Sequence, residues 1–148
     1  MKKLLIYLGF LSALFSCKKE DQATIDENII KQYISDNSLN ASRTESGVYY
    51  VIADTGIGSN PTVDSTVTVN YVGYLTNGNV FDNTKPGSPV TFNLGLLIQG
   101  WKDGLPKIKE GGKIKLIIPS ALGYGSQPKN GIPKNSVLVF DIELLDVL

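Results

Sequence analysis

Apolar residues are arranged along this 148-residue chain in three successive patterns. Residues 4–15 form an almost unbroken apolar run, residues 25–34 carry apolar side chains at helical spacing, and strand-like patterns begin at Gly47. The first run is shorter than the roughly 20 residues that a membrane-spanning helix needs. Because two lysines precede it, the run is typical of an export signal, and we assign residues 1–16 to that signal.

The second pattern predicts an amphipathic helix and linker over residues 24–46, after a polar tether over residues 17–23. Thr24 and Glu27 have the spacing of a capping box, in which the two side chains satisfy backbone N–H groups at the start of a helix. We expect the helix to end near Asp36-Asn37 and to pack on the domain that follows; a second copy or a partner is the alternative. One stripe is formed by Ile25, Ile29, Ile30, Tyr33 and Ile34.

The third pattern predicts a β-rich domain over residues 47–148, which we expect to fold without the segments before it. Its expected strands are rich in β-branched residues or alternate with period two. Asn77-Gly78 predicts a hairpin turn, because both residues tolerate positive φ. The strands are expected at residues 48–53, 66–72, 113–118 and 136–145.

One helix is expected inside the domain, over residues 98–105. Gly100 and Gly104 lower its intrinsic helix propensity, so contacts with the rest of the domain must stabilise it. Antiparallel strands with one short helix against a face of the sheet predict the α+β class.

Composition and charge exclude several functions. Hydrophobic residues make up 42% of the chain and charged residues 19%, which predicts a packed core. Fourteen basic and fourteen acidic side chains balance, so there is no excess positive charge to bind nucleic acid. The chain has no histidine and one cysteine, which excludes His-dependent catalytic triads and zinc clusters. We therefore expect neither a metal nor a cofactor.

The single cysteine ends the apolar run. Leu14-Phe15-Ser16-Cys17 resembles a bacterial lipobox, whose cysteine is acylated and becomes the first residue of the mature protein. The resemblance implies lipidation at Cys17 and anchoring to the cell envelope. The outer membrane is the expected membrane, and whether the protein faces the periplasm or the cell surface is left open. Acylation also removes the reactive thiol that a lone cysteine leaves in an exported protein. A plain signal peptide with an unrelated cysteine, or a buried apolar helix, is the alternative.

Five short strings occur in order through the β-rich domain. They are Val69-Asn70-Tyr71-Val72-Gly73, Phe81-Asp82, Gly100-Trp101, Tyr124-Gly125 and Leu138-Val139-Phe140-Asp141-Ile142-Glu143-Leu144-Leu145. With their spacing, they resemble the FKBP-type, tacrolimus-binding peptidyl-prolyl cis/trans isomerases over residues 47–148. The resemblance implies a five-stranded antiparallel sheet wrapped around one short helix, an apolar pocket between them, and rotation of X–Pro bonds in exported proteins without a cofactor.

The resemblance also assigns pocket roles to individual residues. Trp101 matches the pocket floor, and Asp82 matches an acid beside the pocket. The Tyr124 hydroxyl and the Ile98 backbone N–H match the two donors that bond ligand carbonyls. The catalytic positions are Tyr71, Phe81, Asp82, Trp101, Tyr124 and Phe140, and the substrate-binding positions are Val90, Leu97, Ile98 and Ile132.

Three departures from the family pattern affect the pocket. The chain is shorter than usual between Gly95 and Trp101, which leaves the register of the intervening residues open. Lys85 is the nearest cation where an arginine often pairs with the acid, and Gly131 replaces a common apolar contact. Binding of macrolides such as tacrolimus or rapamycin therefore stays open, as does the oligomeric state.

Two other functions fit the same strings. The pocket of a non-catalytic binding or chaperone module would hold proline-containing segments without turnover. A docking subunit of an envelope or motility assembly would use the fold only as a platform. Proline-containing polypeptides are the expected partners of the isomerase and of the binding module. Nucleic acid is not an expected partner for any of the three functions.

Overall fold

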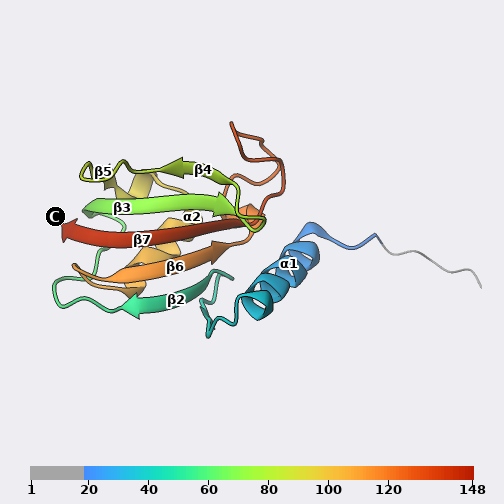
Figure 1. Ribbon diagram of the computed structural model, residues 1–148, viewed down its shortest axis with the longest axis horizontal. Coiled ribbons are helices and arrows are strands. Elements are labelled where there is room, and N and C mark those ends of the chain that lie inside the picture. Colours follow the sequence, from blue (N-terminus) through green and yellow to red (C-terminus); the bar gives the residue numbers. More distant parts are fainter. Residues whose placement is uncertain (1–18) are drawn as a thin grey trace, which may run out of the picture.

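The structure, a computed structural model, describes residues 19–148 (Figure 1). The expected export signal and Cys17 lie outside the described residues. None of the helices within residues 19–148 is long and apolar enough to cross a membrane. The main elements are α1 (Gln22–Asp36), β1 (Ser42–Arg43), β2 (Tyr49–Asp54), β3 (Thr66–Leu75), β4 (Val80–Asn83), β5 (Val90–Asn93), α2 (Gln99–Gly104), β6 (Lys113–Ile118) and β7 (Leu138–Val147). Short 3₁₀ turns occupy η1 (Leu94–Leu96), η2 (Leu105–Lys107) and η3 (Ser120–Leu122).

One antiparallel sheet holds all the strands, in the order β1-β2-β6-β7-β3-β4. β4 and β5 pair with successive stretches of β3, residues 72–74 and 66–69, while β7 pairs with β3 along residues 67–75. β4 and β5 therefore form one interrupted strand along the outer edge of β3. With the two-residue β1 set aside, the sheet has five strand positions, and α2 lies across one face of it (Figure 1). The expected five-stranded α+β fold is confirmed.

The expected strands match the observed ones to within a few residues. The strand expected over residues 113–118 has those bounds, whereas the one expected over residues 66–72 continues to Leu75. β4 and β5 had no sequence signal of their own, because four residues are too few to read a period. Their partner β3 decides where they form.

The turn between β3 and β4 follows the expected hairpin but uses its two residues differently. Gly78 alone has positive φ, at 89°, and its N–H donates to the Leu75 carbonyl. Asn77 instead accepts a hydrogen bond from the Asn79 N–H through its side-chain oxygen, at 3.0 Å. The asparagine thus stabilises the turn by side-chain hydrogen bonding.

The two glycines of α2 let the helix approach β6 closely. A Cβ on Gly100 would lie 2.5 Å from Ile118 side-chain atoms, and one on Gly104 would lie 2.5 Å from Leu116. Both distances are far below a normal carbon contact of about 3.5–4.0 Å. Packing against β6 therefore offsets the low helix propensity of α2, as the sequence pattern required.

The start of α1 differs from expectation. The helix begins at Gln22, and its N-cap is Asp21, whose side chain accepts from the Thr24 N–H at 2.8 Å. The predicted capping box at Thr24 and Glu27 is therefore wrong. Asp21 supplies a cap acceptor earlier in the chain, and the Glu27 carboxylate accepts instead from the Tyr49 hydroxyl at 2.7 Å.

α1 packs on its own domain, beyond the end of the sheet where β6 ends and β7 begins (Figure 1). Ile30 is fully buried and packs with Ile117, Val137 and Val139. The main core, by contrast, is made only of residues from Val48 onward. This is consistent with independent folding of residues 47–148, which stays a prediction. Packing of the helix on its own domain is confirmed.

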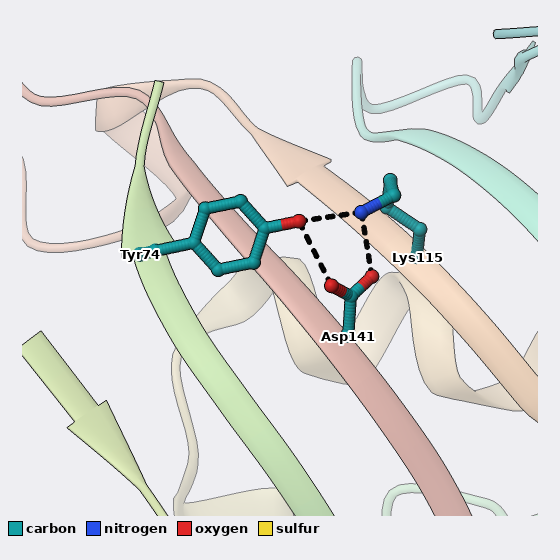
Figure 2. A network of polar contacts seen from close by, with 3 residues as sticks. All are labelled: Tyr74, Lys115 and Asp141. Atoms are coloured by element: carbon teal, nitrogen blue, oxygen red, sulfur yellow. Dashed lines mark hydrogen bonds and ion pairs between the residues drawn. The ribbon is translucent and has the colours of Figure 1, made fainter. Parts of the chain in front are cut away.

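The face of the sheet away from α2 carries a polar network of three strands (Figure 2). Lys115 of β6 and Asp141 of β7 are paired in register, and their ion pair measures 2.6 Å. The Tyr74 hydroxyl donates to Asp141 at 2.8 Å and accepts from Lys115. Burial raises the pKa of Tyr74, so its hydroxyl stays protonated. Each group has a partner, and the network stabilises the register of the central strands.

Candidate functional site

A cavity of about 560 Å³ opens between α2 and the sheet. Its size is in the range of small-ligand sites, which are lined mainly by apolar and aromatic groups with a few polar ones. The apolar and aromatic lining is Tyr71, Phe81, Phe92, Leu96, Leu97, Ile98, Trp101, Tyr124, Ile132 and Phe140; the polar lining is Asp82, Lys129 and Asn130.

The lining residues come from elements far apart in the sequence. β3, β4, β5 and β7 supply one wall, α2 supplies Trp101, and the loop between β6 and β7 supplies Tyr124 and Ile132. Of the ten pocket positions that the family resemblance assigned, nine line this cavity. The fold therefore brings the separate strings of the sequence to one place.

Trp101 lies at the centre of an aromatic array and is only 4% exposed. Its ring meets those of Tyr71 and Phe140 edge to face, with centroids 5.4 Å away in both cases and interplanar angles of 88° and 84°. Phe92 meets it at 6.3 Å and 87°. Edge-to-face contact is the favoured geometry for aromatic pairs, so the indole is firmly held.

Gly73 allows two further rings to meet at the cavity. A Cβ at this position would lie 2.7 Å from both the Phe81 and the Phe140 ring. The two rings pack edge to face with centroids 5.5 Å apart. The glycine of the Tyr71-Val72-Gly73 string is thus required by side-chain packing.

The acid at the cavity is held by a tyrosine. The Tyr71 hydroxyl donates to Asp82 Oδ2 at 2.6 Å. Burial, with the hydrogen bond to Asp82 and its charge, raises the pKa of Tyr71, so this donor persists at neutral pH. Lys85 forms no ion pair with Asp82 in the described part of the chain.

Among the hydrogen-bond donors at the cavity that have no partner within residues 19–148, two are those that the resemblance assigned. They are the Tyr124 hydroxyl and the Ile98 backbone N–H. Burial, and secondarily the charge of Asp82, raises the pKa of Tyr124, which keeps its hydroxyl protonated. The Ile98 carbonyl accepts from the Trp101 N–H at 3.0 Å, so the start of α2 is anchored. An unpaired donor beside an apolar surface is suited to a ligand carbonyl.

Val90 is the one assigned position that does not line the cavity. It is 37% exposed and pairs with Val69, nearer the start of β5. Phe92 lies two residues on, and therefore on the same face, and its ring reaches Trp101. Val90 thus lies one residue pair before the point on β5 where the cavity begins, and its role in substrate binding stays a prediction.

Sequence reasoning also missed four lining residues: Phe92, Leu96, Lys129 and Asn130. Val90 was assigned from the family resemblance, and β5 is too short for a period of two to have pointed to Phe92. Leu97 and Ile98 line the cavity together with Leu96, so the register of this segment stays as the sequence left it.

Gly131 occupies a tight turn beside the cavity. Its φ is +77°, and Lys129 and Ile132 exchange backbone hydrogen bonds of 2.9 Å across it. A Cβ at Gly131 would lie 3.3 Å from Phe81. A larger side chain would therefore be strained at this position, and Ile132 supplies the apolar contact.

No group of three or more His, Cys, Asp or Glu side chains within residues 19–148 is placed to hold a metal ion. The cavity offers apolar contact, the donors of Tyr124 and Ile98, the Asp82 carboxylate, and the polar side chains of Lys129 and Asn130.

Comparison with known proteins identifies a family. Residues 58–145 match the family model of the FKBP-type peptidyl-prolyl cis-trans isomerases. A relative from Buchnera aphidicola (Schizaphis graminum), the FKBP-type peptidyl-prolyl cis-trans isomerase FkpA, is 47% identical over 138 residues, covering 89% of this chain and 55% of the relative. The chain spans about half the length of the curated relatives it matches.

Solved structures agree. The crystal structure of FkpA from Escherichia coli superposes with a TM-score of 0.76 at 42% identity, covering 86% of this chain and 61% of that one. A peptidyl-prolyl cis-trans isomerase from Pseudomonas syringae pv. tomato gives a TM-score of 0.73 at 27% identity, covering 87% and 97%.

Proposed function

Since the chain belongs to the family of FKBP-type peptidyl-prolyl cis-trans isomerases, we propose that its cavity catalyses cis/trans exchange of X–Pro bonds in exported polypeptides. The observation that carries the proposal is an aromatic cavity, floored by Trp101, beside two unpaired donors on Tyr124 and Ile98.

The barrier to X–Pro rotation comes from amide resonance and is about 18–20 kcal/mol. No bond is made or broken, so the site needs only to favour a twisted amide over the planar one. Burial of the proline ring against Trp101 disfavours the planar form, which is the more charge-separated, by removing water from it. A millionfold acceleration requires a barrier lower by roughly 8 kcal/mol.

The two donors supply orientation. The Tyr124 hydroxyl and the Ile98 N–H hold carbonyls that flank the proline, so that rotation occurs about one end of a fixed segment. Asp82, held by Tyr71, completes the polar side of the cavity and adds a negative field beside the rotating amide.

We expect Tyr124→Phe to lower kcat/KM for a Leu-Pro or Phe-Pro model peptide severalfold without abolishing it. The variant removes one hydroxyl and little volume, and a neutral hydrogen bond contributes about 0.5–1.5 kcal/mol. A protease-coupled or NMR exchange assay measures the rate. The control is Tyr50→Phe, a tyrosine that does not line the cavity, which should keep wild-type activity.

The competing function is a binding module that holds proline-containing segments without turnover. Leu96, at the cavity, is 85% exposed and would offer an apolar contact to an extended chain in either function. The same assay separates the two functions. A folded wild-type protein that binds a proline peptide and gives no acceleration over buffer would overturn the enzyme proposal.

We also propose that the mature protein begins at Cys17 and is held to the cell envelope by acyl chains. Each buried methylene of such a chain contributes about 0.8 kcal/mol to membrane binding. We expect Cys17→Ser to move the protein from the membrane pellet to the soluble fraction, or to stall its processing. Immunoblotting of fractionated cells measures this, with Ser16→Ala as the control. A Cys17→Ser protein that still matures and pellets would contradict lipidation.

A further inference from the structure

A buried acid on α1 contacts the loop that carries Tyr124. Asp26 is 1% exposed. Its Oδ2 accepts from the Ser120 N–H at 2.8 Å and from the Ser120 hydroxyl at 2.5 Å, and its Oδ1 accepts from the Gln22 side chain at 2.7 Å. It forms no ion pair with any cation in residues 19–148. An acid buried in this way needs hydrogen bonds to be tolerated, and two of the three come from Ser120.

Ser120 in turn holds both neighbours of Tyr124. Its carbonyl accepts from the Gly123 N–H at 3.0 Å and from the Gly125 N–H at 2.8 Å. Gly125 has a φ of +58°, and its carbonyl accepts from the Asn135 N–H at 2.8 Å. Tyr124 therefore lies between two residues that are fixed to one carbonyl.

The Tyr124 side chain packs against the main core, but its polar end is not held in the same way. Its hydroxyl has no hydrogen-bond partner within the described residues, and the ring is half-buried, with the Lys129 ammonium 5.7 Å from its centroid. The direction of the hydroxyl consequently depends on how the ring packs and on the backbone on either side of it. That backbone is anchored at Ser120, and Ser120 is anchored at Asp26.

We propose that Asp26 is a positioning residue for the isomerase site: through Ser120 it holds the Tyr124 segment so that the hydroxyl faces the substrate carbonyl. This inference rests on the proposed function. α1, which lies outside the β-rich domain, is then part of the support of the site.

The first test compares three variants of the full chain by kcat/KM and by thermal unfolding. Asp26→Ala should lower kcat/KM roughly two- to tenfold, the range that one misplaced hydrogen bond accounts for. Asp26→Asn should restore most of the activity, because its amide oxygen can still accept both bonds from Ser120. Tyr49→Phe is the control: it deletes the Glu27 contact, another hydrogen bond between α1 and the sheet, and should leave kcat/KM unchanged.

A double-variant cycle separates positioning from general damage. If Asp26 acts through the Tyr124 hydroxyl, Asp26→Ala should have little effect on kcat/KM when Tyr124→Phe is already present. An undiminished loss in that background would overturn the proposal. So would an Asp26→Ala protein of wild-type activity.

Amide hydrogen exchange gives a readout that does not require activity. Asp26→Ala should reduce the protection of the Gly123 and Gly125 amides, and Tyr49→Phe should not. Unchanged protection in Asp26→Ala would overturn the proposal even if its activity fell. If the wild type gives no acceleration, the proposed function fails. The exchange protection of the Gly123 and Gly125 amides still shows whether Asp26 positions this segment.

Discussion

Trp101→Ala should lower kcat/KM for X–Pro isomerisation by about a hundredfold or more, which corresponds to roughly 2.7 kcal/mol of lost transition-state stabilisation. The indole is the surface against which the proline ring would be desolvated. It also contacts Tyr71, Phe92 and Phe140 edge to face, so its removal loosens the other walls of the cavity.

Loss of activity in this variant needs a second measurement, because truncating a buried aromatic residue costs about 3–5 kcal/mol of folding stability. Trp101→Leu keeps an apolar side chain of substantial volume and should leave a folded protein that is still slow. Ile108→Ala is the matched control: Ile108 is fully buried in the same core but does not line the cavity. It should lose stability and, well below its Tm, keep its rate. A folded Trp101→Leu protein with wild-type kcat/KM would contradict the role of the indole.

Gly100→Ala should destabilise the fold by about 1–3 kcal/mol, the usual cost of an added methyl group in a filled core. The new Cβ would lie 2.5 Å from Ile118 Cδ1 and Cγ2, so α2 would have to move off β6. For a domain of this size we expect Tm to fall by roughly 3–15 °C. Because Trp101 follows directly, kcat/KM should fall as well.

Compensation tests the mechanism of this loss. Ile118→Ala removes the three atoms that would lie nearest to the Gly100 Cβ. The double variant should therefore be more stable than the sum of the two single effects predicts, as urea unfolding would measure. Additive losses, or a Gly100→Ala protein with the wild-type midpoint, would show that close approach of α2 is not what requires the glycine.

Local patterns were sufficient for most of the fold. β-branched runs located the strand over residues 113–118, the helical stripe located the end of α1 at Asp36, and Asn77-Gly78 located the hairpin. These signals are carried by residues close together in the chain, where alternation, helical period and turn geometry act directly. They failed where a competing local partner existed, as when Asp21 took the cap that Thr24 was expected to form.

The site followed from the sequence less completely. Nine assigned residues meet at the cavity, but their assignment came from resemblance, since a tryptophan or a phenylalanine by itself is equally consistent with ordinary core. Whether Val90 or Phe92 lines the cavity depends on where α2 crosses the sheet. No pattern along β5 records that crossing point.

The contact between Asp26 and Ser120 was beyond any sequence pattern. The residues are 94 positions apart, and neither an aspartate on a helix nor a serine after a proline signals a partner. Tertiary packing decides this contact, because docking of Ile30 against Ile117 and Val139 brings α1 to the end of β6. Local propensity determined which elements form in this protein, and burial of their faces against one another determined which polar groups meet.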